Sequence, residues 1–222
     1  LADEGISADA LATSARRLRA ARDAVDYGLA RFMETLELSF NEEIFASLSR
    51  AAFDAGPEAL RARVLARLIG RFGGASLPPQ LAEVEDLTAR LAADKCTTST
   101  LGGAVVSATP REVKIWREPG RIAGAPLTLR PGVWDVWDQR FRVRSGGADV
   151  HVRALGEAAR RETVVPLLDP RRPLPAAAVA ALPAFWAGDR LLSVPTLKAY
   201  MQSDLAPGLA AEGMEVRPLF GQ

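Results

Sequence analysis

The chain has 222 residues, of which 48% are hydrophobic and 25% charged, and a formal net charge of +1. This composition excludes a mainly disordered chain, and a single cysteine and a single histidine exclude an intramolecular disulfide and disfavour a transition-metal site. There is no run of about 18 apolar residues to cross a membrane and no basic-then-apolar signal peptide, so we predict a cytoplasmic protein without a membrane segment.

Residues 1–95 show a helical hydrophobic period. In the first predicted helix, residues 8–36, large apolar side chains recur every seven positions: Leu11, Leu18, Val25 and Phe32. Pro57 and the pair Gly73-Gly74 bracket a second predicted helix, because proline fits a first helical turn and glycine ends helices. A third helix is predicted from Pro79 to about Asp94. Residues 1–95 are therefore predicted to form a helical domain.

From Cys96 the hydrophobic period changes from helical to alternating, which indicates strands. The glycines of Gly102-Gly103 predict a turn between the first two of them. Val133–Trp137 and Arg140–Arg144 are predicted to pair as a hairpin around Asp138-Gln139.

Prolines punctuate the chain from Val164 onward, with one short helix predicted at Ala176–Leu182 and one strand at Leu191–Val194. The predicted fold class is α+β. An N-terminal helical bundle, residues 1–95, is followed by a mainly antiparallel β domain with short helices, residues 96–222.

One segment, Ser145–Asp149, resembles the S-G-G-x-D-S loop with which PP-loop ATP pyrophosphatases bind phosphate. That loop needs a helix behind it, because the N-terminal amides of the helix face the anion. Here Val150 replaces the last serine, and Val150–Val152 alternates like a strand, so we predict a hairpin turn instead. The sequence shows no Walker loop, no G-x-S-x-G elbow and no helical His-Glu pair, and no catalytic residue is assigned.

Several short segments resemble, in order, those of bacterial tRNA(Ile)-lysidine synthetases, a family of the PP-loop ATPase superfamily. The most specific are T-L-G-G at Thr100–Gly103, W-R-E-P at Trp116–Pro119 and W-D-x-R-F-R-V at Trp137–Val143. Further matching segments are Arg61–Leu65, Gly73-Gly74, Leu77–Pro79, Leu182–Trp186 and Leu191–Pro195. Ala104 and Gln139 depart from the family pattern, which often has Cys and Gly there.

The resemblance implies a role in tRNA modification. Whole enzymes of this family are ligases that use ATP, with magnesium, to adenylate the wobble cytidine of CAU-anticodon tRNA(Ile) and then attach lysine to give lysidine. Their PP-loop lies near the start of the protein, whereas this chain begins at Leu1 directly before its first predicted helix. The resemblance therefore implies the tRNA-recognition region of a longer enzyme, with tRNA(Ile) as partner and no cofactor of its own. Lysine and ATP would be bound by the missing N-terminal domain, and the chain alone would be inactive.

Arginine is the residue type from which we predict an RNA site. It supplies 25 of the 28 basic side chains, and residues 96–222 hold 16 basic against 12 acidic residues. Guanidinium groups pair with phosphates and stack on bases. The predicted RNA-binding residues are Arg140, Arg142, Arg144, Arg153, Arg160, Arg161, Arg171 and Arg172.

The first three of these arginines are expected on one strand face, with Arg153 on a neighbouring strand. Trp134 and Trp137 are three residues apart, so one of them is expected in the core. A solvated surface would account for the same arginines without a ligand.

Two other functions remain open from the sequence. The apolar face of the first helix predicts a protein-interaction module that docks on a partner, and a homodimer is also open. A free-standing ATP-using enzyme built on Ser145–Asp149 is the third reading. Salt-sensitive RNA binding would separate the RNA reading from apolar docking.

Overall fold

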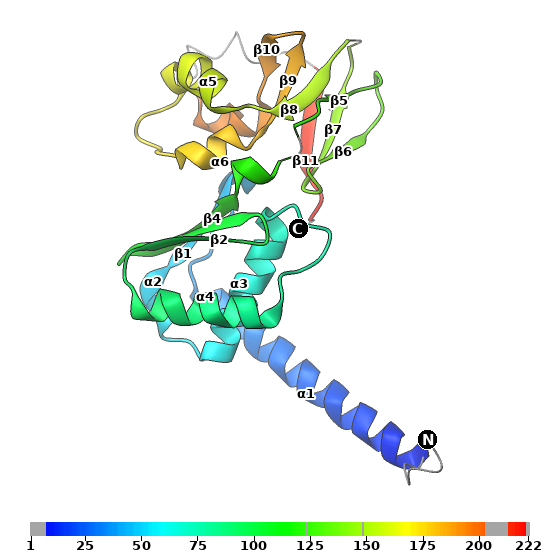
Figure 1. Ribbon diagram of the computed structural model, residues 1–222, viewed down its shortest axis with the longest axis vertical. Coiled ribbons are helices and arrows are strands. Elements are labelled where there is room, and N and C mark those ends of the chain that lie inside the picture. The colour runs from blue at the N-terminus through cyan, green and yellow to red at the C-terminus, as the bar shows by residue number, and fades with distance from the viewer. Residues whose placement is uncertain (1–7, 123, 148, 203–212, 221–222) are drawn as a thin grey trace.

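The computed structural model describes residues 8–122, 124–147, 149–202 and 213–220. Two units lie one above the other, and a long helix, α1 (Ala8–Thr35), projects away from the lower one (Figure 1). The lower unit combines helices with an antiparallel sheet, and the upper one is built mainly of antiparallel strands. The predicted α+β class is confirmed.

Three helices of the lower unit follow α1: α2 (Arg50–Asp54), α3 (Glu58–Phe72) and α4 (Leu81–Ala93). They pack on an antiparallel sheet of order β1-β4-β3-β2, whose strands are β1 (Phe45–Ser49), β2 (Thr97–Leu101), β3 (Ala104–Ala108) and β4 (Glu112–Arg117). One apolar core unites helix and strand residues, among them Phe53, Leu68, Phe72, Val106 and Ile115. The three predicted helices are confirmed, whereas β1 was missed.

The predicted domain boundary between residues 95 and 96 remains a prediction. The core of the lower unit takes residues from both sides of it, because β1 pairs with β4 from Phe45 opposite Trp116 to Ser49 opposite Glu112. Helices and sheet of this unit therefore share one interior.

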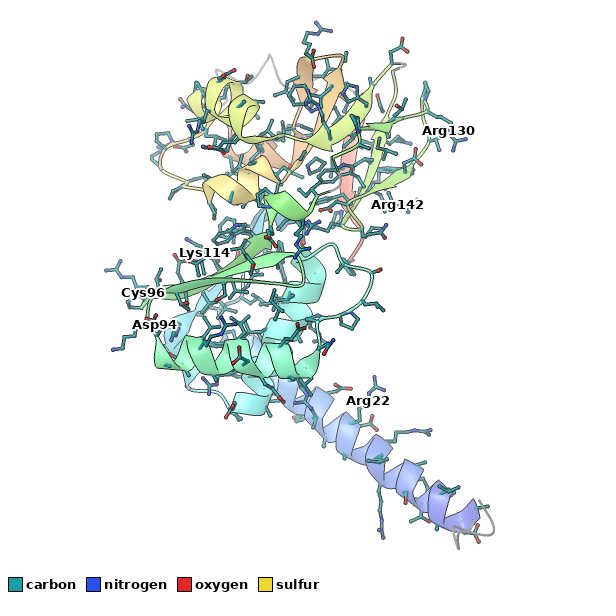
Figure 2. The ribbon with its side chains drawn as sticks, viewed as in Figure 1. Arg22, Asp94, Cys96, Lys114, Arg130 and Arg142 are labelled. Atoms are coloured by element: carbon teal, nitrogen blue, oxygen red, sulfur yellow. The ribbon has the colours of Figure 1, made fainter. Side chains whose placement is uncertain are left out.

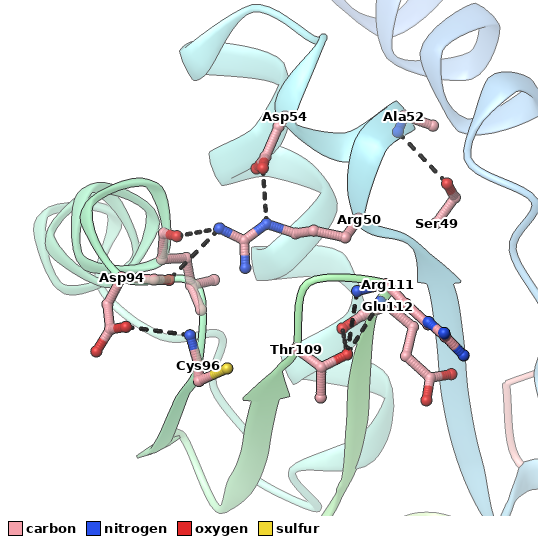
Figure 3. Close-up of polar contacts among 10 residues, drawn as sticks. Ser49, Arg50, Ala52, Asp54, Asp94, Cys96, Thr109, Arg111 and Glu112 are labelled. Carbon is pink, nitrogen blue, oxygen red and sulfur yellow. Dashed lines mark hydrogen bonds and ion pairs between the residues drawn. The ribbon is translucent and has the colours of Figure 1, made fainter.

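Arg50 ties α2 to the end of α4 (Figure 3). Its side chain is buried, its Nε donates to Asp54 at 2.7 Å, and its Nη2 donates to the carbonyls of Leu91 and Asp94. Leu91 lies in the last turn of α4 and Asp94 directly follows the helix, where backbone acceptors lack helical partners. Arg50 therefore closes the C-terminal end of α4 from inside the protein.

Helix α1 is buried only near its C-terminal end. Leu29 and Phe32 join the core, as does Leu36 directly after the helix, whereas Leu11 and Leu18 are 49% and 72% exposed. The apolar stripe predicted for this helix is thus open to solvent over its first half (Figure 1). None of the helices in the described ranges combines the length and apolar character that a bilayer crossing requires.

The upper unit contains two sheets. The first has the order β10-β9-β8-β5, with β5 (Leu127–Thr128), β8 (His151–Ala154), β9 (Pro183–Ala187) and β10 (Arg190–Ser193). The second, which we call the outer sheet, has the order β11-β7-β6, with β6 (Asp135–Trp137), β7 (Phe141–Ser145) and β11 (Met214–Pro218). A core that includes Trp137, Val143, Val152 and Phe185 lies between them.

The other side of the first sheet is covered by short helices. These are α5 (Glu157–Ala159), η4 (Arg160–Val164), η5 (Val165–Leu167), α6 (Ala176–Ala180) and η6 (Pro195–Tyr200). A second apolar core lies between the first sheet and these helices, and it includes Ala184 and Trp186 of β9. Phe185, between them in sequence, faces the core shared with the outer sheet, as strand alternation requires. The outer sheet therefore has one face in the core, and its other face is not covered by any of these helices.

Ser145–Asp149 connects two sheets instead of forming the predicted hairpin. β7 pairs with β6 and β11, whereas β8 pairs with β5 and β9. The turn itself is present, although Ala148 lies outside the described residues. A hairpin does form one turn earlier, around Asp138 and Gln139, whose φ angles of 52° and 53° suit a tight hairpin turn.

A buried ion pair joins the two units. Arg117, at the end of β4, donates from Nε and Nη2 to the carboxylate of Asp138, both at 2.7 Å. It also donates to the carbonyls of Gly73, Gly103 and Arg121 at 2.6 to 2.8 Å. Both side chains are about 5% exposed or less. Arg117 therefore connects the end of α3, the β2–β3 turn and the β6–β7 turn.

Candidate nucleic-acid interface

The open face of the outer sheet carries a cluster of arginines. Along β7 the side chains of Phe141, Val143 and Ser145 are buried, so Arg142 and Arg144 project outward. On the neighbouring strand β11, Arg217 lies opposite Arg142, and Glu215 lies opposite Arg144. The sheet thus places these four charged side chains on one face.

Trp134 is the centre of this cluster. The guanidinium carbons of Arg142, Arg144 and Arg217 lie 5.5, 4.9 and 4.7 Å from the centre of its ring. These distances allow cation–π attraction between the indole and all three guanidinium groups. Trp137, by contrast, is 5% exposed and belongs to the core, so the prediction that one of the two tryptophans is buried is confirmed. We call Trp134, Arg142, Arg144 and Arg217 the outer-sheet cluster.

Charge in the outer-sheet cluster is only partly balanced. Glu215 pairs with Arg144 and, at 3.2 Å, with Arg217. The hydrogen bond from Arg144 is the main cause that lowers the pKa of the Glu215 carboxyl below its ordinary value. Within the described residues, Arg142 has no acidic partner. Three cations therefore face one carboxylate, which leaves a net positive, exposed surface around an aromatic ring.

Two neighbouring residues extend this surface. Val136, which pairs with Arg142 across the sheet, is 46% exposed. Arg130 is exposed and lies on the same side of the upper unit as Arg142 (Figure 2). The open face thus combines apolar and cationic side chains.

Arg140 does not share this face, contrary to the sequence expectation. It is 3% exposed and precedes β7, so strand alternation does not apply to it. Its Nη2 donates to the carbonyl of Glu43 at 3.1 Å, and its guanidinium lies over Phe141 and Phe72. Burial is the main cause that lowers its pKa to about 10. Arg140 is packed between the two units.

Arg153 also differs from its expected position. Its strand, β8, does not pair with β7 but belongs to the other sheet, where Arg153 lies 4.0 Å from the centre of the Trp186 ring. The expectation that it joins Arg142 and Arg144 is wrong.

The remaining predicted arginines lie around the short helices and each has a partner. Arg160 and Arg161 both bond Glu157, whose pKa these hydrogen bonds lower to about 2. Arg171 bonds Asp169, and Arg172 lies over Tyr200 and bonds the carbonyl of Ala199. Whether these four bind RNA stays a prediction.

Arg217 and Glu215 were missed by sequence reasoning. The segment Met214–Pro218 alternates charged and apolar residues, which is the signal of a half-buried strand. The segment is short and follows a Pro- and Gly-containing stretch, so its pairing with β7 was not foreseeable.

The residues present do not fit an ATP site of the PP-loop type. Strand β8 follows Ser145–Asp149 where that loop requires a helix, so helical amides cannot face a phosphate there. In the ranges that the structure describes, no three His, Cys, Asp or Glu side chains are grouped as metal ligands. No step of ATP chemistry is assigned to these residues.

The chain is similar to a curated protein, the tRNA(Ile)-lysidine synthase of Ruegeria pomeroyi (strain ATCC 700808 / DSM 15171 / DSS-3). The two are 29% identical over 214 residues, which cover 96% of this chain and 47% of that protein. The resemblance drawn from the sequence segments is confirmed by this similarity. The chain spans about half the length of the relative. No family model matches the chain, and no solved structure matches it.

Proposed function

We propose that this chain binds tRNA for a tRNA-modifying ligase, through the outer-sheet cluster. The observation that carries the proposal is the group of three arginines around Trp134 on an open sheet face. The similarity to a tRNA(Ile)-lysidine synthase supports tRNA as the nucleic acid. The cytoplasm is its proposed place of action.

The cluster suits RNA for physical reasons. Guanidinium groups bind phosphates through two parallel hydrogen bonds and also stack on bases. An indole offers a flat surface for an unpaired base, which is how proteins commonly bind single-stranded RNA. Glu215 holds Arg144 and Arg217 in place when no phosphate is near. Phosphate oxygens would replace this carboxylate when RNA binds.

In the proposed role the chain holds the body of tRNA(Ile) while another part of the enzyme modifies the wobble cytidine with ATP and lysine. It would also help to discriminate against tRNA(Met), which has the same anticodon before modification. The outer-sheet cluster then supplies affinity, because phosphate contacts position a protein without reading sequence.

A titration of the chain with unmodified tRNA(Ile) and tRNA(Met) at two salt concentrations tests the proposal. We expect affinity for tRNA(Ile) to fall with salt, with a log–log slope of roughly 0.7 to 0.9 per phosphate contact. The variant Arg142→Ala/Arg144→Ala/Arg217→Ala should lose at least about tenfold in affinity and have a smaller slope.

The matched control removes three exposed arginines from the lower unit: Arg67, Arg90 and Arg111. Both triple variants lose the same charge, so equal losses of affinity would show that only net charge matters and would refute the site. Glu215→Gln is the opposite test, since it removes the carboxylate that pairs with Arg144 and Arg217 of the cluster and should raise affinity about three- to tenfold at low salt. No binding of tRNA at low salt would refute the function.

A second candidate function is docking on another protein through α1. It is favoured by the exposed stripe that contains Leu11 and Leu18, which matches the heptad spacing of a coiled coil. Sedimentation of this chain at low and high salt would detect association of two copies through this stripe. A complex that persists in high salt and is lost in Leu11→Ser/Leu18→Ser would support docking, whereas a monomer at all concentrations would oppose self-association through this stripe.

A further inference from the structure

A cavity of about 790 Å³ lies where the two units meet. Its walls come from η2 (Asn41–Glu43) of the lower unit and from η6, β7 and β11 of the upper unit. This volume is within the range of pockets that hold small organic ligands. The cavity is separate from the exposed side of the outer sheet.

The walls of the cavity are largely apolar and include rings. Phe141, Pro195, Val216, Pro218 and Phe220 line it, and Phe220 is 44% exposed. Aromatic rings and prolines present flat surfaces against which a planar ligand can stack. The lining therefore favours a flat, partly apolar group.

Three polar side chains on the cavity have unused bonding capacity. The hydroxyl of Thr196 is buried and has no hydrogen-bond partner among the described residues. Within the same residues, neither the Glu42 carboxylate nor the Lys198 ammonium forms an ion pair, although both line the cavity. The adjacent Glu43, by contrast, is paired with Arg71. A buried hydroxyl without a partner is rare and calls for a ligand group or water.

The backbone beside the cavity is strained. Asn41, Glu42 and Glu43 have φ angles of 42°, 55° and 61°, so three successive non-glycine residues are left-handed. Each such residue costs on the order of 1 kcal/mol or more, and such strain gathers at binding sites. This turn is what places Glu42 at the cavity.

Strand β11 connects the cavity with the outer-sheet cluster. Val216 and Pro218 line the cavity, whereas Arg217, between them, lies over Trp134 on the open face. Successive residues of a strand are only about 3.3 Å apart. β11 runs from the upper unit toward the joint with the lower one (Figure 1). Because β11 is the edge strand of the outer sheet, the cavity and the outer-sheet cluster lie on its two faces, and RNA that contacts Arg217 reaches the cavity around this edge.

We infer that the cavity receives one unpaired nucleotide of the bound RNA. The base stacks on the Phe220 and proline walls, the Glu42 carboxylate accepts a hydrogen bond from an exocyclic amino group, and the Lys198 ammonium meets the phosphate. The Thr196 hydroxyl bonds the base or ribose. Uracil has no exocyclic amino group, so uridine is disfavoured. The inference rests on the proposed function for the source of the nucleotide, because a free nucleotide has the same chemistry.

Mononucleotides and tRNA test the inference in parallel. AMP, CMP, GMP, UMP and ribose 5-phosphate are titrated into the chain by calorimetry, and tRNA(Ile) by the salt-controlled assay above. We expect AMP, CMP and GMP to bind, UMP to bind several-fold more weakly, and ribose 5-phosphate not to bind. Lys198→Ala should weaken mononucleotide and tRNA binding about tenfold, since it removes a charge-assisted contact.

Thr196→Val is the sharper variant. It keeps the shape of the side chain and removes a hydroxyl that bonds nothing in the described protein, so the thermal midpoint should not fall. It should nevertheless weaken mononucleotide and tRNA binding several-fold without changing the salt slope. Arg190→Ala, an exposed cation of β10 outside the cavity, is the control and should change neither.

The outcomes separate this inference from the proposed function. If tRNA binds through the outer-sheet cluster, but no mononucleotide binds and both cavity variants bind tRNA normally, the inference is overturned and the proposed function stands. If mononucleotides bind in a Thr196- and Lys198-dependent way and tRNA does not bind, the RNA source is overturned together with the proposed function, and the cavity is a site for free nucleotides.

Discussion

Replacement of Arg117 should uncouple the two units of the protein. Its guanidinium makes five hydrogen bonds, two to Asp138 and one each to the carbonyls of Gly73, Gly103 and Arg121. Arg117→Met keeps the length of the side chain and removes all five. The carboxylate of Asp138 then stays at the joint, with Arg140 at 3.8 Å as its remaining cation.

The expected loss of unfolding free energy follows from this geometry. Removing one partner of a buried ion pair costs about 3–5 kcal/mol, because the other charge stays buried without compensation. Three carbonyls also lose their donor. Each lost hydrogen bond costs about 1 kcal/mol or more where water cannot replace it. Arg140, 3.8 Å from Asp138, still compensates part of its charge, and the cleft at Gly73 and Gly103 admits some water, so we expect a loss below the sum of these costs, about 4–5 kcal/mol. This is a large part of the about 5–15 kcal/mol that stabilises an ordinary protein.

Urea unfolding, followed by circular dichroism and by tryptophan fluorescence, measures the loss. The wild type should give coincident curves, whereas Arg117→Met should unfold in two steps, with the upper unit separating from the lower one. The control Arg121→Met changes a side chain that is 74% exposed and should cost less than about 0.5 kcal/mol.

Asp138→Asn and the double variant complete a thermodynamic cycle. Asparagine tolerates the left-handed conformation at φ 52°, so the single variant removes charge without adding backbone strain. The double variant Arg117→Met/Asp138→Asn should be more stable than the sum of the single losses predicts. Additive losses, or a loss below about 1 kcal/mol in Arg117→Met, would refute the argument that this ion pair joins the units.

Three further predictions concern stability. Gly103→Ala should strongly lower the free energy of unfolding, because φ at this residue is 78° and a Cβ would lie 2.4 Å from the carbonyl oxygen of Gly73. Gly120→Ala is the control, since a Cβ there meets only open space, and it should be near neutral in the same urea assay. Arg50→Met should cost about 3 kcal/mol, since it leaves Asp54 and the last carbonyls of α4 without their donor; an unchanged midpoint would contradict this. Glu157 has a pKa lowered from 4.5 to about 2 in the folded state, so its contribution is present above about pH 4.5 and is lost as the pH falls toward 2. The melting temperatures of wild type and Glu157→Gln should therefore differ at pH 6 and converge as the pH approaches 2; a constant difference would count against the ion pairs.

The periodicity of apolar residues was sufficient to predict the long helices and most of the strands. The spacing of apolar residues placed the first three long helices close to their observed bounds, and Asp138-Gln139 marked the hairpin turn correctly. β1 was missed because Phe45–Ser49 is a short segment between two helices, and its strand character depends on pairing with β4, far along the chain.

The candidate site was only partly foreseeable. Alternation within β7 correctly placed Arg142 and Arg144 on one open face. The same rule failed for Arg140, because that residue precedes the strand, and for Arg153, because consecutive strands entered different sheets. Arg217 completes the cluster from a strand that follows a long connection, and such nonlocal pairing leaves no trace in local sequence.

The segments that resemble the family contain the residues of the joint between the two units. The resemblance therefore supports a shared fold more directly than a shared function. Arg117 of the W-R-E-P segment bonds Asp138 of the W-D-x-R-F-R-V segment, and its other acceptors include Gly73 and Gly103, both within matching glycine pairs. The side chains of Arg117 and Asp138 are buried at the joint between the two units, away from the open face of the outer sheet. Of the arginines of the outer-sheet cluster, Arg142 lies within the W-D-x-R-F-R-V segment, whereas Arg144 and Arg217 lie outside every matching segment. A relative can therefore keep the joint and hence the fold while its binding face changes, so the outer-sheet cluster has to be tested on this chain's own residues.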